Sequence, residues 1–216
     1  EKARRGSAPA QINVPRDYWT QVIDIELPQV IEVERSPGGE AAIAKAAALL
    51  SEASFPVILN GAGAVLSGAI ETSVSLAERL GAPVCCNYQH NDAFPGSHPL
   101  AAGPLGYNGS KAAMELISRA DVVLALGTRL NPFSTLPGYG IDYWPKDARL
   151  IQVDINADRI GLTKKVDVAI QGDARRVAEQ LLRQLSVNSG DQGRAQRADL
   201  IAKCKSDWAS ELASMD

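Results

Sequence analysis

Short continuous apolar runs, separated by amphipathic stretches, constrain the fold of this chain more than any other feature. Strands that are apolar along their whole length are typical of a parallel sheet buried on both faces. The helical stretches between the runs supply the cover for both faces. The sequence therefore predicts an α/β domain over 38–185, with a doubly wound, mostly parallel, Rossmann-like sheet. Its expected strands are 55–59, 83–86, 121–126, 150–154 and 166–170.

The stretches between these runs carry helix signals. Gly81 follows one expected helix, which runs on from Gly63 to Leu80, as a natural C-terminal cap. Asp173 is a reasonable N-cap for another helix. The stretches 40–53, 110–119 and 173–185 complete the expected helices, and 87–104 is expected to be a long irregular segment.

Segments on either side of 38–185 look different. Residues 11–14 predict a short strand that ends at Pro15, and 20–37 are expected to be a linker. After a polar linker at 186–194, one face of a final helix is apolar. Because no partner for that face is evident, we expect it to dock on a surface or on an absent domain. Its residues are Leu200, Ile201, Cys204, Trp208 and Leu212.

Composition and charge exclude several classes of protein. With 22 Lys and Arg against 25 Asp and Glu among 216 residues, the formal charge is −3, so general attraction to a nucleic acid is not expected. No apolar run reaches the length of a membrane span. Three cysteines, two of them adjacent, make no disulfide framework and indicate a reduced, cytoplasmic protein. The missing initiator Met suggests a piece of a longer chain.

Candidate site residues follow the expected strands, because ligands of such folds bind beyond the strands' carboxyl ends. Gly61 and Gly63 would let backbone N–H groups approach a phosphate, although Leu66 breaks the three-glycine dinucleotide fingerprint and a plain tight turn stays open. Each candidate alone is more easily structural, but together they predict a nucleotide cleft. The others are Asn87, Tyr88, Gln89, Gly106, Tyr107, Asn108, Gly127, Arg129, Asp154, Ile155, Gly172 and Asp173.

Catalytic and metal-ligating patterns are missing. The chain has no Gly-x-Ser-x-Gly elbow and has two histidines, which leaves few options for a triad. His90 and His98 flank Asp92 at a spacing that fits no standard zinc motif. We therefore assign no catalytic residue and no metal ligand to this chain.

The order of the strand-end motifs resembles the central domain of thiamine-diphosphate enzymes of the acetolactate-synthase type. The motifs include Phe-Pro-Val-Ile-Leu-Asn-Gly-Ala-Gly at 55–63, Ala-Asp-Val-Val-Leu-Ala-Leu-Gly-Thr-Arg at 120–129 and Ile-Gln-Val-Asp-Ile-Asn at 151–156. Residues 8–17 are similar to the closing strand of that family's first catalytic domain. Segments 15–19 and 208–216 look most like an acyltransferase branch of the family.

This resemblance implies a parent with three α/β domains, in which thiamine diphosphate and Mg²⁺ sit between the first and third. Residues 1–37 would then end the first domain and link it to the central one, and 186–216 would lead to the third. The absent domains would be partners within a homo-oligomer, and the part in hand would be structural and inactive. The implied reaction cleaves a sulfonated aldehyde, releases sulfite and transfers a two-carbon unit to phosphate as acetyl phosphate.

In such relatives the central domain holds FAD, an ADP moiety or nothing. The resemblance places Gly61 and Gly63 at the phosphates, and Arg129 and Asp154–Ile155 near the diphosphate and adenosine. The residues that would line the cleft are Asn87, Tyr88, Gln89, Gly106, Tyr107 and Asn108. Segment 130–133 is Leu-Asn-Pro-Phe where FAD-binding relatives have charged residues, and Asn108 replaces a His of one such relative. FAD, ADP and an empty cleft all stay open.

Two alternative functions stay open as well. The chain could be the central domain of an acetolactate synthase or a related thiamine-dependent decarboxylase. It could instead be a free-standing FAD or adenine-nucleotide module, similar to the FAD domain of an electron-transfer flavoprotein or to a sirtuin core. A sirtuin would need a catalytic His beside the pocket and a zinc ribbon of paired Cys-x-x-Cys, which this sequence lacks.

Overall fold

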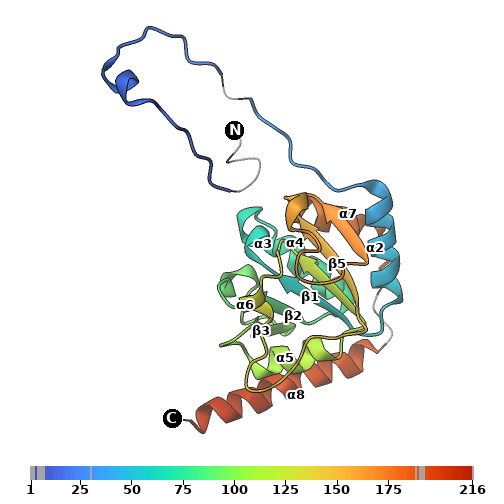
Figure 1. Ribbon diagram of the computed structural model, residues 1–216. Coiled ribbons are helices and arrows are strands. Elements are labelled where there is room, and N and C mark those ends of the chain that lie inside the picture. Colours follow the sequence, from blue (N-terminus) through green and yellow to red (C-terminus); the bar gives the residue numbers. More distant parts are fainter. Residues whose placement is uncertain (1–2, 4–7, 30, 188, 190–192, 216) are drawn as a thin grey trace. The chain divides into compact units, whose positions relative to one another are not determined.

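The computed structural model describes residues 3, 8–29, 31–187, 189 and 193–215, and it divides into two units, Glu1–Arg35 and Ser36–Asp216 (Figure 1). In the first unit, the described residues form an exposed chain with one 3₁₀ helix, η1 (Arg16–Thr20). The predicted strand at 11–14 is wrong, because these residues are not paired in any sheet. A strand needs a neighbour for its backbone N–H and C=O groups, and the described residues provide none for this segment.

The second unit is built on a six-stranded sheet in the order β3-β2-β1-β4-β5-β6. Every neighbouring pair is parallel, which confirms the predicted doubly wound α/β class. The central strands β1 and β4 are buried at every residue, as a sheet covered on both faces requires. The strands are β1 (Pro56–Asn60), β2 (Val84–Asn87), β3 (Ala101–Leu105), β4 (Val122–Leu126), β5 (Arg149–Asp154) and β6 (Val168–Gln171).

Strand β3 begins inside the segment 87–104 that was expected to be irregular, so that expectation is wrong for 101–104. Its sequence, Ala-Ala-Gly-Pro-Leu, contains two residues that weaken strands. Pro104 is tolerated because β3 is an edge strand with a single neighbour, β2. The pairing of β2 with β3 also shifts register at Val84 and Cys85.

Helices cover both faces of the sheet, and the expected helix from Gly63 to Leu80 is two helices. Gly68, with a φ of +67°, separates them. Gly81 ends the second in the left-handed conformation, as predicted. The helices are α2 (Glu40–Glu52), α3 (Ala62–Leu66), α4 (Ile70–Leu80), α5 (Lys111–Ser118), α6 (Pro132–Thr135), α7 (Ala174–Gln184) and α8 (Arg194–Ala213), with the 3₁₀ turns η2 (Asn91–Ala93) and η3 (Ala157–Arg159).

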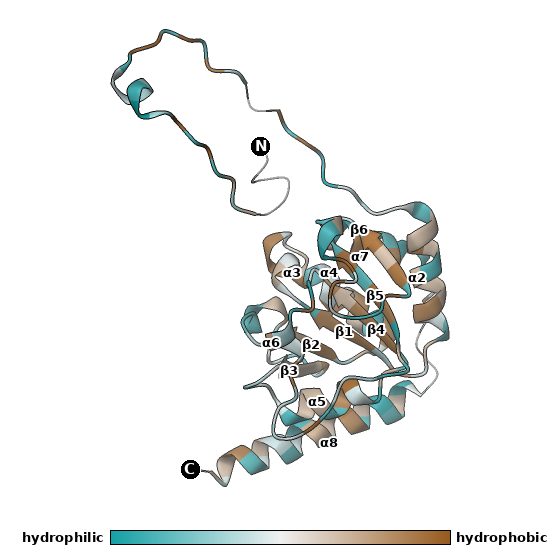
Figure 2. Cartoon of the chain, in the orientation of Figure 1, coloured by the Kyte–Doolittle hydropathy of each residue, from teal (hydrophilic) through white to brown (hydrophobic). Residues whose placement is uncertain are grey.

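Alternate residues of strands β1 to β5 enter two separate apolar cores, whereas β6 contributes to the first core alone. On β1, Ile58 faces the core that α2, α4 and α7 close. Val57 and Leu59 face the second core, which α5 and α8 close. Apolar side chains therefore line both faces of these strands. Figure 2 shows the hydrophobic character of the strands in brown.

The apolar face of α8 packs on a surface of this unit, which confirms the first of the two expected alternatives. Ile201 and Cys204 are buried in the second core, and Leu200 and Trp208 pack against it. Leu212, near the end of the helix, stays 45 % exposed. The partner helix is α5, which lies alongside α8 in Figure 1.

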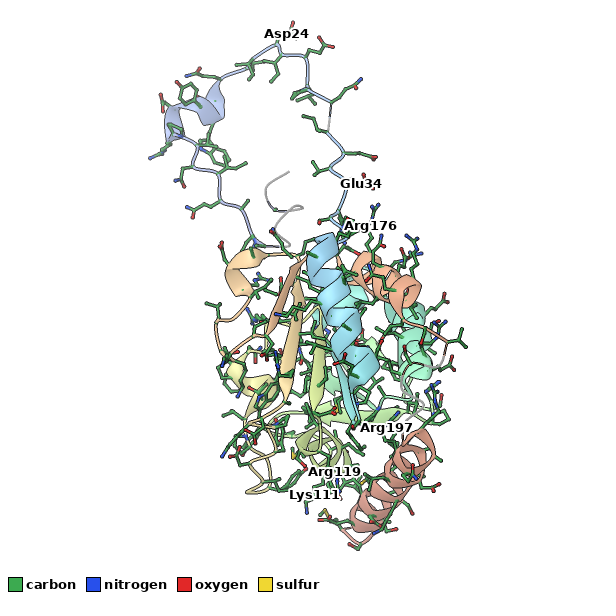
Figure 3. All side chains as sticks on the ribbon, turned by 90° about the vertical axis from the view of Figure 1, so that its right-hand side faces the viewer. Asp24, Glu34, Lys111, Arg119, Arg176 and Arg197 are labelled. Carbon is green, nitrogen blue, oxygen red and sulfur yellow. The ribbon has the colours of Figure 1, made fainter. Side chains whose placement is uncertain are left out.

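A buried arginine fixes the other end of α8 (Figure 3). The Arg197 guanidinium donates to the carbonyl oxygens of Ser54 (2.7 Å), Leu80 (2.9 Å) and Gly81 (3.2 Å). These carbonyls lie at and just beyond the C-terminal ends of α4 and α2, where helix carbonyls lack intrahelical donors and carry partial negative charge. Arg197 therefore joins three helices through a single side chain.

Two glycine turns cross where the strand order reverses, between β1 and β4. A Cβ built on Gly63 would lie 2.7 Å from the Cα of Gly127, and one built on Gly127 would lie 2.6 Å from the backbone N of Ala64. Gly127 also has a φ of +63°. Only glycines allow the two backbones to approach this closely.

We expect Arg197→Met to lower the free energy of unfolding by about 3 kcal/mol, because three buried carbonyls lose a charged donor. Urea denaturation followed by circular dichroism measures the change. Lys203→Met, at an exposed position of the same helix, is the matched control. A loss below about 1 kcal/mol for Arg197→Met would contradict the role given to this side chain.

We expect Gly63→Ala to destabilise the fold by at least about 2 kcal/mol, since the new Cβ meets backbone that cannot move aside. Thermal unfolding of the purified chain measures this loss. Gly96→Ala is the control, because a Cβ there has no heavy atom within 4 Å. Equal unfolding temperatures for the two variants would show that the crossing tolerates a side chain.

Candidate functional site

The carboxyl ends of all six strands share one edge of the sheet, because every pair is parallel. The strand order reverses between β1 and β4, and ligands of open α/β sheets bind beyond such a switch point. The sheet brings six of the predicted residues together at and beside this point. They are Gly61, Gly63, Asn87, Gly127, Arg129 and Asp154, on the turns after β1, β2, β4 and β5.

The two glycines after β1 serve the crossing of the turns. The backbone N–H of Gly61 donates to the Leu126 carbonyl (3.1 Å), and that of Gly63 donates to the Gly127 carbonyl (2.8 Å). A Cβ on Gly61 would lie 2.5 Å from the Cβ of Thr128. Both N–H groups that were expected at a phosphate therefore have backbone acceptors, and packing explains why the residues are glycines.

A buried polar pair sets the shape of the turn that follows β4. Asn87, at the end of β2, donates from Nδ2 to Thr128 Oγ1 (3.0 Å), and that oxygen also accepts from the backbone N–H of Leu130 (3.1 Å). Leu130 takes a φ of +52°, which is uncommon for a residue with a side chain. This bonding fixes the turn from which the exposed Arg129 projects.

Asp154, at the end of β5, is a buried carboxylate of this edge, at 6 % exposure. Burial raises its pKa, and the backbone N–H of Asn156, which donates to Oδ1 at 2.9 Å, and the positive charges of Arg159 and Arg129 oppose the shift. The arrangement sets an exposed cation and an acceptor oxygen on neighbouring strands. A diphosphate and a ribose hydroxyl need these two groups.

The other predicted residues lie further from the switch point. Tyr88 is half-buried and passes close to Gly106, where an added Cβ would lie 3.4 Å from Tyr88 Cδ1 and 2.5 Å from the Phe133 carbonyl. Gln89, Tyr107 and Asn108 are exposed, and Ile155 is half-buried.

Gly172 and Asp173 follow β6, at the opposite end of the edge from Gly106. Five strand spacings, about 24 Å, separate the two ends, so they do not form one compact pocket. The N–H of Gly172 donates to the Asp154 carbonyl, and that of Asp173 donates to Ser36. The Asp173 carboxylate also accepts from the N–H groups of Arg175 and Arg176, as the predicted N-cap of α7.

Asn60 and Thr128 are buried polar residues of this edge that the sequence prediction did not single out. Asn60 is fully buried, and its Nδ2 donates to Ser73 Oγ (2.8 Å) and to the Ala93 carbonyl (2.9 Å). It thereby ties the end of β1 to α4 and η2. One signal was available, since Asn60 is a polar residue that directly follows an apolar run.

Nucleophiles and metal ligands are sparse in the part of the chain that the structure describes. Within that part, no three His, Cys, Asp or Glu side chains gather as a metal site would require. The three cysteines are free and buried, and burial raises the pKa of Cys86 to about 12 and that of Cys204 to about 11. Burial raises the pKa of Cys85 as well, so all three thiols stay protonated at neutral pH.

Among the described residues, no helix is both long enough and apolar enough to cross a membrane.

Comparison with known proteins agrees with this geometry. Residues 43–181 match the family model described as "Thiamine pyrophosphate enzyme, central domain". A solved structure of a putative thiamin diphosphate-dependent enzyme from Mycobacterium smegmatis superposes with a TM-score of 0.61 at 25 % identity, over 74 % of this chain and 30 % of that one.

Two curated relatives extend the match. The probable sulfoacetaldehyde acetyltransferase of Rhizobium meliloti is 71 % identical over 216 residues, which is all of this chain and 36 % of the relative. The probable acetolactate synthase large subunit of Methanocaldococcus jannaschii is 37 % identical over 181 residues, 81 % of this chain and 30 % of the relative. This chain thus spans about a third of the relatives it matches, and it belongs to the central-domain family of thiamine pyrophosphate enzymes.

Proposed function

We propose that this chain is the central domain of a sulfoacetaldehyde acetyltransferase, which converts sulfoacetaldehyde and phosphate into acetyl phosphate and sulfite. One observation carries the proposal. Identity to a relative of that name is 71 % and extends over the whole chain, whereas identity to an acetolactate synthase is 37 % over 81 % of it. The match includes the segments outside 43–181, where the general family model stops.

In this proposal the domain is structural. Thiamine diphosphate, held with Mg²⁺ by the first and third domains of the longer protein, supplies the nucleophilic carbon of the reaction. The described residues of this chain do not fit that cofactor, because they bring no three metal-ligating side chains together and their thiols are protonated. The chain's own contribution is a rigid body, with α8 fixed by Arg197 and the sheet closed at its glycine crossing.

The same proposal implies which domains contact this one and in which cellular compartment the protein lies. The first and third domains of the same chain would contact this one, within a homo-oligomer. Apolar side chains on the first unit support such contacts, since Trp19 is 76 % exposed and Val22 98 % exposed. The three free, buried cysteines suit the reducing cytoplasm.

A second function, binding of an adenine nucleotide as ADP or as part of FAD, is proposed for the switch point. Arg129 supports it, because it is exposed beside the buried Asp154 on the neighbouring strand. The guanidinium would pair with the diphosphate, and a carboxylate oxygen of Asp154 would accept from a ribose hydroxyl. Because the N–H groups of Gly61 and Gly63 are already bonded, Arg129 would carry most of the phosphate binding.

We expect the purified 216-residue chain neither to consume sulfoacetaldehyde nor to bind thiamine diphosphate. The full-length protein should release sulfite from sulfoacetaldehyde only when phosphate is present. Sulfite and acetyl phosphate assays, with pyruvate as the alternative substrate, measure this. Turnover by the 216-residue chain, or consumption of pyruvate without sulfite release by the longer protein, would refute the proposal.

We expect ADP to bind the chain, and Arg129→Gln to weaken that binding about tenfold, which is about 1.4 kcal/mol. Isothermal titration calorimetry measures the Kd. Arg183→Gln, an exposed arginine at the end of α7, is the control with the same change of charge. If Arg129→Gln leaves the Kd for ADP unchanged, ADP does not bind at the switch point. A colourless sample that cannot be titrated with FAD would exclude the flavin.

A further inference from the structure

A concave site lies at the opposite, amino-terminal edge of the sheet. It is a cavity of about 300 Å³, lined by the start of β4, by the loop 144–148 with the first two residues of β5, and by Lys164, Lys165 and Asp167 just before β6. The six residues of β5 separate this edge from the switch point by about 17 Å. The cavity is therefore distinct from the proposed nucleotide cleft.

The lining is positively charged although the whole chain is acidic. Four cationic side chains, Lys146, Arg149, Lys164 and Lys165, face two carboxylates, Asp147 and Asp167. The difference of four and two gives a local charge of +2, against −3 for the full sequence. A cation-rich hollow in an acidic protein attracts anions selectively to that place.

Asp167 holds Arg149 in position for such an anion. One carboxylate oxygen of Asp167 accepts from Arg149 Nε (2.7 Å), and the other accepts from the backbone N–H of Leu150 (2.9 Å). Although burial by itself would raise the pKa of Asp167, these two donors lower it, so the carboxylate stays charged. The bond uses Nε alone, and among the described residues the two Nη groups of Arg149 have no protein acceptor.

The three lysines of the cavity differ in their contacts with other side chains. Lys164 Nζ lies 4.8 Å from the centre of the Trp144 ring, so this pair forms one wall of the cavity. Lys146 pairs with Asp142 at 3.2 Å. Lys165, in contrast, makes no ion pair within 4.0 Å in the described part of the chain. The Nη groups of Arg149 and the ammonium group of Lys165 are thus available to bind an anionic ligand.

We propose that this amino-edge cavity binds the phosphate group of a small ligand, either inorganic phosphate or a small phosphate ester. A guanidinium with free Nη groups matches two oxygens of a phosphate, and Lys165 and Lys164 add point charges. The cavity volume is at the lower end of small-molecule sites, which suits an ion or a small ester rather than a dinucleotide. The site does not rest on the acetyltransferase proposal, since all of its residues belong to this chain and lie away from the switch point.

Calorimetric titration of the 216-residue chain with inorganic phosphate tests the proposal, at constant ionic strength set with sodium chloride. Lys164→Gln/Lys165→Gln should weaken phosphate binding at least fivefold while the far-ultraviolet circular dichroism spectrum is unchanged. Arg183→Gln/Lys203→Gln removes two charges at exposed positions outside the cavity and should stay within twofold of the original Kd. Arg129→Gln, titrated in parallel, reports any phosphate that binds at the switch point instead of the cavity.

Three outcomes would overturn the proposal. The first is no binding above the chloride blank. The second is an equal loss in the cavity variant and in the control, which would show general charge attraction. The third is a loss confined to Arg129→Gln, which would place the anion at the switch point. A parallel titration with glucose 6-phosphate separates the two sources: tighter binding of the ester assigns an organic phosphate, and tighter binding of the free ion assigns inorganic phosphate.

Discussion

The contact between the turns after β1 and β4 is the constraint on which the rest of the structure depends. Gly63 and Gly127 meet backbone against backbone, at the point where the strand order turns in opposite directions from the centre. A side chain on either glycine would push the two central strands apart at their carboxyl ends. This contact preserves the register of the central strands. That register decides which side chains enter each apolar core, and it also positions Arg129 and Asp154.

The two edges of the parallel sheet carry different kinds of polar side chain. The carboxyl edge gathers the polar turns with Asn60, Asn87 and Asp154, whose side chains are mostly engaged in holding the turns together. The amino edge carries the cation-rich cavity with Arg149 and Lys165, whose charges are less fully engaged. The two proposed anion sites thus differ in construction.

Local signals in the sequence were sufficient for most of the fold. Continuous apolar runs identified five of the six strands, and Gly81 and Asp173 marked helix ends correctly, because each acts through its own backbone or its near neighbours. Strand β3 escaped because Gly103 and Pro104 interrupt its apolar pattern, which an edge strand tolerates. The roles of Gly61 and Gly63 escaped for a different reason, since a tertiary contact with the turn at Gly127 decides them.

The three bonds of Arg197 have a consequence for how the protein is made. Strands β1 to β6 all precede α8 in the chain, so during synthesis the complete sheet leaves the ribosome before its last helix. Until residues 194–213 emerge, the second core lacks the cover of Ile201 and Cys204, and the carbonyls of Ser54, Leu80 and Gly81 lack their donor. A nascent chain stalled at this stage would expose an apolar face to chaperones and to other nascent chains.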